Sequence, residues 1–503
     1  MDTTKQNINI IENNSKTGAK NLWKECDDDC QMHATIFSIE SDETSYLLKK
    51  INIIDLEKRK EVYGVCGECN EPGTGVQWCQ PCNAKRFKEN FKNWTSGNKN
   101  IDELIQQSQL NAFINIKCLE WIPFERFENV TYLTRGGFSK IYKADWPEGN
   151  IDYWDIENQE LVRESNVKVV LKSLDNSSNM SNDFLNEIKY YISGHFYCIQ
   201  TVICYGITKD PDTKDYMMVL HYYKDGNLRN NLMNDLEYKN KILYLYCIID
   251  GLSTIHNTGR VHKDFHSGNI LILDDFPFIS DLGMCQPVND NERKGVYGVI
   301  PYMAPEVLRG YQYTKAADIY SFGIIMNELM SEEIAFNDIP HDRTLAVKIC
   351  KGFRPKISED TPKLIADLII KCWDAKAENR PTAKELCQIM LTYRQEINDE
   401  DGEIYSQIKE CEKIKENRSK NRTKENKSKN IQTHPQAIYS SRLLNFENLP
   451  EPVNSTDYLT SFQEPVSSTS ANPISECLDI ELNELGKIFV FKYVKLRQFN
   501  LIN

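Results

Sequence analysis

HKDFHSGN, at residues 262–269, is the stretch of this sequence that decides the fold. It is followed by DLG at residues 281–283 and by APE at residues 304–306. Two further motifs precede it, LTRGGFSKIYKA at residues 133–144 and VVLK, which ends at Lys172. Each motif alone is a weak signal, but the whole set in this order makes a highly specific pattern.

The two upstream motifs suit phosphate chemistry for physical reasons. A glycine-containing turn between two strands, here with Gly136 and Gly137, lets backbone N–H groups approach phosphate oxygens without an intervening Cβ. A lone lysine such as Lys172 is costly on a buried strand unless an acid pairs with it. Glu187 follows fifteen residues later on an expected helix and is a suitable ion-pair partner.

The elements expected around these motifs change in type along the chain. Runs rich in β-branched and aromatic residues predict strands near residues 130–142, 167–174 and 216–222. Beyond residue 228, long apolar periodicities predict helices. Strands first and helices afterwards predict an α+β unit with a sheet-rich lobe and a helical lobe.

Taken together, the motifs resemble those of eukaryotic protein kinases. The DFHS form of the catalytic loop, residues 264–267, is most similar to the tyrosine-kinase-like group, and with the cysteines upstream the chain resembles a family of fungal kinases. The resemblance implies a bilobal α+β kinase fold over residues 126–395, with a β-sheet and helix C in the N-lobe and a helical C-lobe. It also implies transfer of a phosphoryl group from ATP, with Mg²⁺, to a protein substrate.

The resemblance assigns catalytic roles to five residues. Lys172 would hold the α- and β-phosphates of ATP while paired with Glu187. Asp264 would accept or orient the proton of the substrate hydroxyl, and Asn269 and Asp281 would bind Mg²⁺. The implied ATP-binding residues are Leu133, Gly136, Gly137, Ile141, Val170, Lys172, Leu220, Tyr222, Tyr223, Leu271 and Asp281. Leu220 falls at the gatekeeper position, and His221–Tyr223 would be the hinge. The resemblance also implies that Asp318 braces the catalytic loop and that Arg380 pairs with Glu306.

The sequence departs from the family pattern at several positions. Thr134 and Ser139 replace the outer glycines of the glycine loop, so we expect a stiffer loop. Lys263 replaces an arginine that commonly receives a loop phosphate, and residues 284–303 contain no Ser or Thr. We therefore expect weak dependence on loop phosphorylation, with Tyr297 the sole candidate switch. His266 stands where typical Ser/Thr kinases carry lysine, and the wider group favours Ser/Thr substrates. The alternative is a pseudokinase scaffold that holds a protein partner.

Four cysteines precede the kinase-like region as a pair of CxxC sequences, Cys66, Cys69, Cys79 and Cys82. Four thiolates at this spacing satisfy tetrahedral Zn²⁺, so we expect a structural, zinc-ribbon-like site. A redox-active pair is the rival, but the βαβ context of a thioredoxin-like motif is absent. The group Cys26, Cys30 and His33 is interpreted as coincidental. A protein partner could bind at the zinc module or the tail.

Composition and local sequence divide the remaining chain. We expect a polar leader at 1–60, the zinc module at 61–100, a helical linker at 101–125, and a low-complexity, mostly disordered tail at 396–503. Residues 145–166 are expected to form an inserted hairpin. The 503 residues carry a net charge of −13, which argues against a nucleic-acid partner, and no apolar run is long enough for a membrane span. No secretory signal is visible, so we expect a cytoplasmic protein, with a basic run at 409–430 leaving a nuclear location open.

Overall fold

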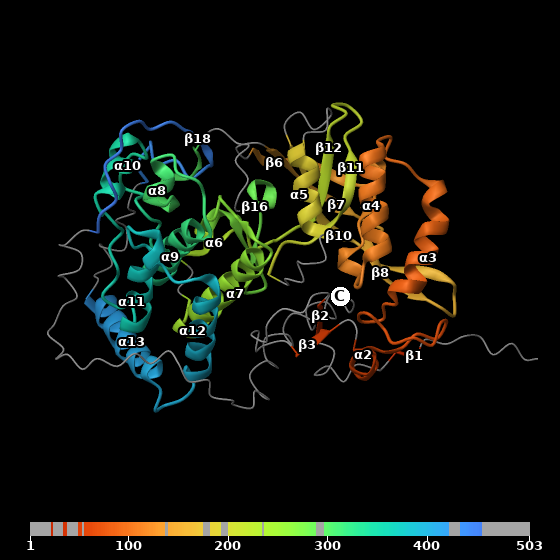
Figure 1. The fold of residues 1–503 in the computed structure, drawn as a ribbon, viewed down its shortest axis with the longest axis horizontal. Coiled ribbons are helices and arrows are strands. Elements are labelled where there is room, and N and C mark those ends of the chain that lie inside the picture. The colour runs from red at the N-terminus through yellow and green to blue at the C-terminus, as the bar shows by residue number, and fades with distance from the viewer. Residues whose placement is uncertain are drawn as a thin grey trace, which may run out of the picture.

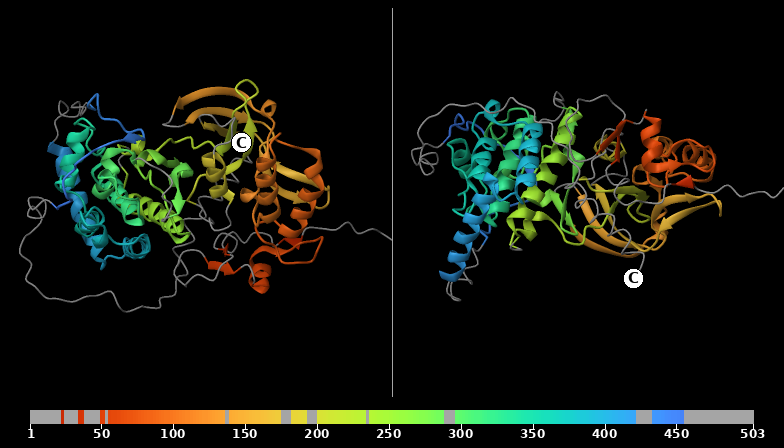
Figure 2. Two further views of the ribbon diagram at one scale, coloured as in Figure 1. Left: turned by 45° about the horizontal axis from the view of Figure 1, so that its top comes forward. Right: turned by 90° about the horizontal axis from the view of Figure 1, so that it is seen from below.

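The structure is a computed structural model that describes residues 22–23, 34–37, 49–52, 55–135, 139–174, 182–192, 200–233, 236–287, 296–421 and 433–454. Its parts lie side by side along the long axis of the molecule (Figure 1). A sheet-rich lobe is joined on one side by a helical lobe and on the other by the cysteine-containing region (Figure 2). The α+β, two-lobed fold expected from the sequence is confirmed.

The N-lobe contains a six-stranded sheet. In sheet order, its strands are β5 (Glu120–Trp121), β11 (Cys204–Lys209), β12 (Tyr216–His221), β10 (Val167–Leu174), β7 (Ser139–Trp146) and β6 (Glu128–Arg135). Helix α5 (Asn182–Ile192) carries Glu187 and contacts the turn formed by the DLG motif.

Successive side chains of β10 point to opposite faces of the sheet, and the two faces differ in what they contact. Val169 and Leu171 are fully buried against β7 and β12, in a cluster with Trp146 and Val219. Lys172, one residue further on, therefore faces the opposite side of the sheet. A period of two thus places the functional lysine on one face while its apolar neighbours anchor the strand from the other.

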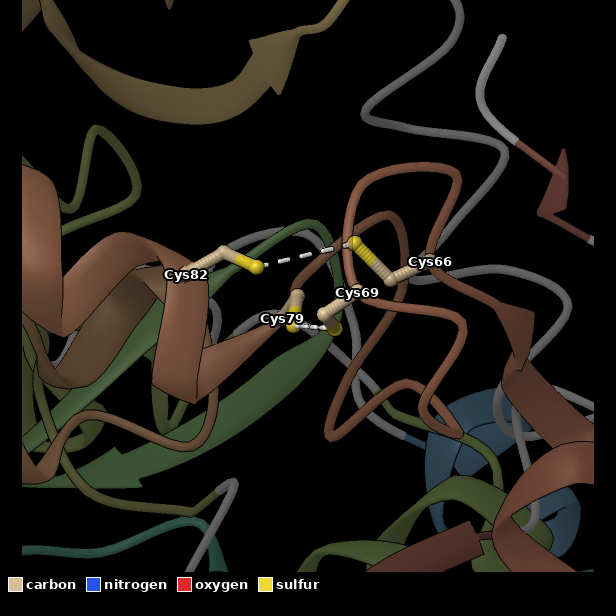
Figure 3. Close-up of side chains that lie close together, drawn as sticks. All are labelled: Cys66, Cys69, Cys79 and Cys82. Atoms are coloured by element: carbon tan, nitrogen blue, oxygen red, sulfur yellow. Dashed lines mark hydrogen bonds between the residues drawn. The ribbon is translucent and has the colours of Figure 1, made fainter. Parts of the chain in front are cut away.

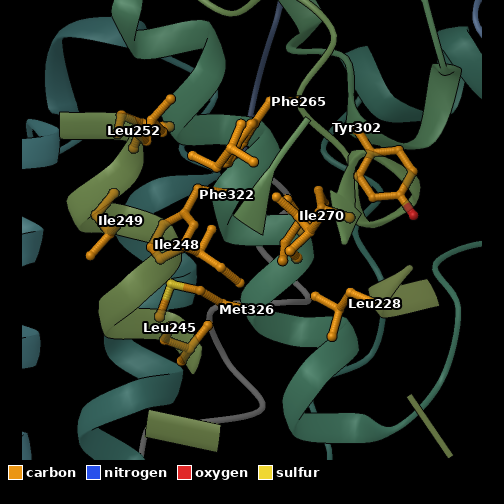
Figure 4. Packing of buried hydrophobic residues seen from close by; sticks show 14 of the residues in the cluster. Leu228, Leu245, Ile248, Ile249, Leu252, Phe265, Ile270, Tyr302, Phe322 and Met326 are labelled. Carbon is orange, nitrogen blue, oxygen red and sulfur yellow. The ribbon is translucent and has the colours of Figure 1, made fainter. Parts of the chain in front are cut away.

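The C-lobe is helical. Its helices are α6 (Leu228–Asn231), α7 (Tyr238–Asn257), α8 (Pro305–Leu308), α9 (Lys315–Ser331), α10 (Arg343–Cys350), α11 (Lys363–Cys372) and α12 (Ala383–Glu396). Helix α9 is buried on nearly all sides, as its apolar composition predicts for a central helix. Phe265 of the catalytic loop and Ile270, just after the loop, pack with Leu245, Ile249, Phe322 and Met326 of α7 and α9 (Figure 4). Each such buried side chain contributes about 1.5–3 kcal/mol, so this core fixes the loop's position.

Short strands frame the catalytic loop and the segment before the APE motif. They are β13 (Arg260–Val261) with β16 (Gln286–Pro287), β14 (Ile270–Leu273) with β15 (Phe276–Ile279), and β17 (Val296–Gly298) with β18 (Arg442–Leu444). The last pair joins residues almost 150 positions apart in the sequence, so its contact depends on the tertiary fold.

The region before the N-lobe sheet folds against it. It contains β1 (Leu22–Trp23), β2 (Ala34–Phe37), β3 (Lys49–Asn52), α2 (Leu56–Tyr63), β4 (Gly64–Val65), α3 (Gln80–Asn90) and α4 (Lys99–Asn111). Ile101, Leu104 and Ile105 of α4 are buried in the same cluster as Ile188 of α5. The expected helical linker therefore contains a helix that is packed onto the N-lobe, because these three apolar residues share one face.

The insertion at residues 145–166 forms a hairpin, as expected, from β8 (Asn150–Asp155) and β9 (Glu160–Glu164). Arg163 binds both carboxylate oxygens of Glu120 on β5, at 2.7 and 2.9 Å. Ile151 packs with Trp78 and Phe87 of the cysteine-containing region. The hairpin therefore connects the N-lobe sheet to that region.

The expectation of a mostly disordered tail is wrong for two stretches of residues 396–503. Helix α13 (Glu403–Asn421) buries Ile404, Ile408 and Cys411 in the main core. Residues 433–454, called the C-terminal segment below, run over the C-lobe and include β18. The polar average composition of residues 396–503 did not indicate these contacts, because a few apolar side chains are enough to dock a segment on a folded surface. None of the described helices is both long and apolar enough to cross a bilayer.

Candidate active site

Three charged side chains meet where the N-lobe sheet, α5 and the DLG motif come together. Lys172 Nζ lies 2.7 Å from Glu187 Oε1 and 2.9 Å from Asp281 Oδ1. The side chains of Lys172 and Glu187 are 7% and 1% exposed, whereas that of Asp281 is 41% exposed. Asp281 thus extends a buried ion pair to a position that solvent reaches.

The electrostatics of this cluster keep the lysine charged. Burial opposes the charged form of Lys172, but the carboxylates of Asp281 and Glu187 outweigh it and raise the pKa of the ammonium group. Burial raises the pKa of Glu187, and the neighbouring ammonium group offsets only part of that rise. Removing either partner of this buried ion pair would destabilise the protein, because the remaining charge would be buried without a counter-charge.

Gly283 is required by this close packing. A Cβ atom built at Gly283 would lie 2.7 Å from Oε2 of Glu187. A side chain there would force the carboxylate end of Glu187 to shift, so the glycine of the DLG motif leaves room for the carboxylate that pairs with Lys172. Leu282 beside it is 1% exposed and fills the core as an apolar plug.

The catalytic loop is held by Asp318 at the start of α9. Its Oδ2 accepts hydrogen bonds from the backbone N–H of His262 at 2.7 Å and contacts His256 Nε2 at 2.8 Å, and its Oδ1 accepts from the N–H of Lys263 at 3.0 Å. Lys263 has a φ of +70°, in the left-handed region that non-glycine residues rarely adopt. The carboxylate of Asp318 compensates this strain, in agreement with the bracing role expected for it.

Asp264 and Asn269 contact each other within the catalytic loop. Asn269 Nδ2 donates to the backbone carbonyl of Asp264 at 2.9 Å and to its Oδ2 at 3.2 Å. The amide nitrogen is thus directed to Asp264, and the side-chain oxygen of Asn269 is the atom left to bind a cation. Burial opposes ionisation of Asp264, yet interactions with His266 and Ser441 hold its pKa below the usual range for a carboxyl group. The aspartate is therefore ionised and can accept a hydrogen bond at neutral pH.

His266 and Arg229 also belong to this site, although the sequence pattern identified His266 only as a missing lysine. His266 Nε2 lies 3.6 Å from Asp264 Oδ2, and its Nδ1 lies 3.1 Å from Nη2 of Arg229. Tyr302 Oη donates to Glu328 at 2.7 Å and lies 2.9 Å from the hydroxyl of Ser267. Sequence spacing could have suggested His266, two residues from Asp264, but not Arg229, which arrives from a separate helix.

The described residues assigned to adenine binding lie on strands of the N-lobe sheet, in the hinge and on β14. Val170 pairs across the sheet with Leu220, and Ile141 pairs with Lys172. Leu133 on β6 is 45% exposed, and Leu271 on β14 is half-buried. In the hinge, the N–H of Tyr222 donates to the carbonyl of Lys168 at 3.1 Å, and the Tyr223 ring packs 5.0 Å from that of Phe278. Gly136 and Gly137 lie outside the described residues.

The expected brace between the APE motif and the end of the C-lobe is present. Arg380 binds both carboxylate oxygens of Glu306, at 2.7 and 2.8 Å. This bidentate geometry fixes the segment that follows β17. Tyr297, the candidate switch, lies within β17, where its carbonyl accepts a hydrogen bond from Tyr313 at 2.5 Å.

Comparison with known proteins agrees with this geometry. The family model described as protein tyrosine and serine/threonine kinase matches residues 127–390. The chain belongs to this family. The kinase is 31% identical over 192 residues to a LIM domain-containing serine/threonine-protein kinase of Dictyostelium discoideum, which is 37% of this chain and 29% of that protein.

Two further relatives place the similarity in the same region. A serine/threonine-protein kinase/receptor of Acanthamoeba polyphaga mimivirus is 34% identical over 187 residues, covering 36% of this chain and 12% of that protein. A serine/threonine/tyrosine-protein kinase of Arabidopsis thaliana is 24% identical over 330 residues, covering 62% of this chain and 81% of that protein. The match thus spans less than a third of the first two relatives.

The four cysteines of the CxxC pairs converge on one point in front of the N-lobe. The sulfur atoms of Cys66 and Cys82 are 3.9 Å apart, those of Cys69 and Cys79 are 3.6 Å apart, and all four lie within 4.8 Å of one another (Figure 3). Four thiolates around Zn²⁺, at about 2.3 Å each, place the sulfurs about 3.8 Å apart. The residues therefore fit a four-coordinate zinc ion. Cys26, Cys30 and His33 lie outside the described residues.

The electrostatics of the cluster favour at least one thiolate. The hydrogen bond from Cys79 to Cys66 lowers the pKa of the Cys66 thiol to about 5, and burial raises the pKa of Cys82 to about 12. Cys79 immediately precedes α3, and Cys82 lies in its first turn, where the helix dipole favours negative charge.

The inserted hairpin covers the cysteine cluster on one side. Ile156, at the hairpin turn, is 4% exposed and packs with Cys66 and Cys79. The guanidinium of Arg86 lies 4.1 Å from the centre of the Trp154 ring. This shared packing ties the cysteine module to the N-lobe.

Proposed function

We propose that this kinase transfers the γ-phosphoryl group of ATP, with Mg²⁺, to serine or threonine hydroxyls of proteins in the cytoplasm. One observation carries the proposal. Lys172, Glu187 and Asp281 form a bonded, largely buried cluster, and the hydrogen bond from Ser280, the neighbour of Asp281, to the carbonyl of Asn269 holds this cluster beside Asn269 and Asp264. The serine/threonine preference rests on the printed names of the relatives and on resemblance to the wider group.

The mechanism follows from the charges of these residues. Bound Mg-ATP supplies the transferred phosphoryl group and the cations that offset its charge. Lys172 would hold phosphate oxygens, since Glu187 orients its ammonium group, and Asp281 and Asn269 would hold the metal through oxygen ligands. Asp264, ionised and 7% exposed, would orient the substrate hydroxyl and take its proton. His266, whose Nε2 lies 3.6 Å from Oδ2 of Asp264, would hold that carboxylate in position.

A pseudokinase scaffold is the alternative, and the arrangement of the five groups argues against it. A protein that only held a partner would have no need for all of them at bonding distance. Buried charges are costly to keep, so their retention favours catalysis.

Activity can be measured on the purified chain with radiolabelled Mg-ATP and casein. We expect the wild type to label casein and Asp264→Asn to lose at least 100-fold in rate, as expected when a positioned base is removed. Phosphoamino-acid analysis should give phosphoserine or phosphothreonine. Equal labelling by wild type and Asp264→Asn contradicts the enzyme proposal, and phosphotyrosine alone contradicts the assigned substrate class.

We also propose that the four cysteines hold a structural Zn²⁺ ion. Four protein ligands leave no position for a substrate, so the ion would act through folding. Stoichiometric zinc in the purified chain should disappear in the Cys66→Ser/Cys69→Ser variant. Its persistence there would refute the site. The outer face of the module remains a suitable place for a protein partner.

A further inference from the structure

The C-terminal segment brings a serine hydroxyl to the catalytic aspartate. Ser441 Oγ lies 2.6 Å from both carboxylate oxygens of Asp264. Ser441 is 177 residues away from Asp264 in the sequence, and none of the catalytic roles derived above uses its hydroxyl group. The contact therefore calls for a separate explanation.

Backbone pairing positions the segment around this serine. Strand β18, which begins at the residue after Ser441, pairs antiparallel with β17, so that Gly298 lies opposite Arg442 and Val296 opposite Leu444. Strand β17 lies just before the APE motif in the sequence, and its partner β18 lies near α8 and α10 of the C-lobe (Figure 1). Peptides commonly bind proteins by adding a strand in this manner, with backbone hydrogen bonds giving register.

Side chains on both sides of Ser441 fix it in place. Leu444 is 7% exposed and joins the main core, whereas its neighbour Leu443 is 57% exposed. Arg442 Nη2 donates to the carbonyl of His341 at 2.6 Å. On the other side, Tyr439 Oη donates to the carbonyl of Ala335 at 2.8 Å.

Arg229 of helix α6 also holds the segment. Arg229, which contacts His266 of the catalytic loop, donates through Nη1 to the carbonyl of Tyr439 at 3.2 Å, and its guanidinium lies 4.8 Å from the centre of the Tyr439 ring. The same arginine thus positions both the residue beside Asp264 and the backbone that presents Ser441.

Further anchors hold the segment beyond β18. Arg343 Nη2 donates to the carbonyl of Glu447 at 2.9 Å, and Arg309 forms an ion pair with Glu451 in which Nη1 and Oε2 are 2.7 Å apart. The N–H of Val453 donates to the carbonyl of Cys350 at 3.0 Å. These contacts extend over α8 and α10, so the placement of Ser441 does not depend on one hydrogen bond.

We propose that the C-terminal segment is an intramolecular substrate and that the chain phosphorylates its own Ser441. This inference rests on the proposed kinase activity and adds the identity of one acceptor. Its geometry meets the requirement that a general base lie within hydrogen-bond reach of the proton that it removes.

The reaction balances with ATP as the only co-substrate. Ser441 Oγ forms a bond to the γ-phosphorus of ATP, and the bond between that phosphorus and the oxygen bridging to the β-phosphorus breaks. ADP leaves with the electron pair of that bond. The hydroxyl proton passes to Asp264 and from there to solvent.

Phosphorylation then changes the occupancy of the cleft. A phosphoserine carries about −1.5 to −2 charges at neutral pH, and it would stand beside the ionised carboxylate of Asp264. Repulsion between these charges releases the segment and opens the cleft to other proteins. Before that step, the segment competes with them, so labelling of an external substrate begins with a lag.

The first experiment locates the phosphate and its origin. The phosphatase-treated full chain is incubated with Mg-ATP over a 100-fold range of enzyme concentration, and phosphopeptides are quantified by mass spectrometry. We expect phosphate on Ser441 with a rate constant that is independent of concentration. Asp264→Asn and Ser441→Ala should abolish it, and Ser440→Ala should be labelled like the wild type.

The second experiment tests the docking of the segment with a matched pair of variants. Leu444→Asp places a charge in the core contact, and Leu443→Asp places the same charge on the exposed side of the same strand. Leu444→Asp should slow labelling of Ser441 at least tenfold and remove the lag with casein, and Leu443→Asp should behave like the wild type. Arg442→Ala, a milder change, should act in the direction of Leu444→Asp, and thermal melting checks that each variant is folded.

Failure of this inference is distinct from failure of the kinase proposal. Casein labelling without phosphate on Ser441 overturns the inference alone. So does a Ser441 rate proportional to enzyme concentration, or wild-type Ser441 labelling in folded Leu444→Asp and Arg442→Ala. Absence of label in both casein and the chain overturns the proposed kinase activity, and the inference with it.

Discussion

The cysteine module and the C-terminal segment flank the kinase domain and contact it at opposite ends (Figures 1 and 2). The module packs on the outer side of the N-lobe, where Ile151 and Ile156 of the inserted hairpin meet it. The segment packs on the C-lobe and reaches Asp264 with Ser441. The cysteine module therefore lies far from the catalytic carboxylates, whereas the C-terminal segment contacts Asp264.

This difference separates a folding role from a regulatory one. The module contributes stability through a local ligand set and a buried joint, so its loss should weaken the N-lobe without directly altering Asp264. The segment is held by contacts distributed along its length and by no metal-ligand set, so its release should be easier and should change activity. The following predictions test that contrast, from the largest expected effect to the smallest.

Removal of the metal should have the largest effect on stability. Binding of structural zinc is worth about 10–16 kcal/mol in small zinc-dependent peptides, so Cys79→Ser should unfold the module. We expect loss of bound zinc and loss of hydrogen-exchange protection at residues 64–90, while α7 and α9 stay protected. Equal protection of the module in wild type and Cys79→Ser contradicts the folding role.

Truncation of a side chain in the contact between the hairpin and the module should cause a smaller loss of stability. Ile156→Ala removes a buried side chain that packs on Cys66 and Cys79, and such truncations cost about 2–5 kcal/mol. We expect a lower midpoint for N-lobe unfolding in urea, with the C-lobe midpoint unchanged. Leu161→Ala, which truncates a half-buried side chain that also packs against the module, should lose less stability than Ile156→Ala.

The hydrogen bond from Ser441 should stabilise the C-lobe in a pH-dependent manner. The pKa of Asp264 lies below its usual range, so the stability that this group contributes is fully present above about pH 4, the ordinary aspartate value, and is lost as the pH falls further. Ser441→Ala removes one cause of that depression and should cost roughly 1.5 kcal/mol at pH 7. Urea unfolding should give the same difference between the two proteins at pH 8 and pH 6, and a shrinking one below pH 4. A difference that grows on acidification contradicts this assignment.

The smallest expected effect concerns His266, which contacts the same carboxylate as Ser441. His266→Ala should lower kcat for casein roughly tenfold, about 1.4 kcal/mol in the barrier, because Asp264 loses a positioning contact. His266→Lys restores a donor and should recover most of the rate. A fall in activity that lysine does not rescue, accompanied by a lower melting temperature, would instead indicate a purely structural role.

The sequence allowed prediction of the parts of the site that depend on local spacing. The CxxC pairs place four ligands near one point because each pair spans a single turn, and the strand carrying Lys172 and the helix carrying Glu187 follow from periodicity. Arg229 and Ser441 were missed, because they come from distant elements and belong to no short pattern. The inserted hairpin was predicted as a hairpin, but its contact with the module depends on how both pack against the N-lobe.

By itself, the sequence determined the family, the two-lobed fold and the candidate catalytic and metal-binding residues. Motif order and periodicity encode these features directly, since they arise from short-range geometry. Only the tertiary structure decided that α13 and the C-terminal segment are docked and that Ser441 meets Asp264. Such contacts depend on which surfaces the folded core leaves uncovered, and neither composition nor spacing along the chain carries that information.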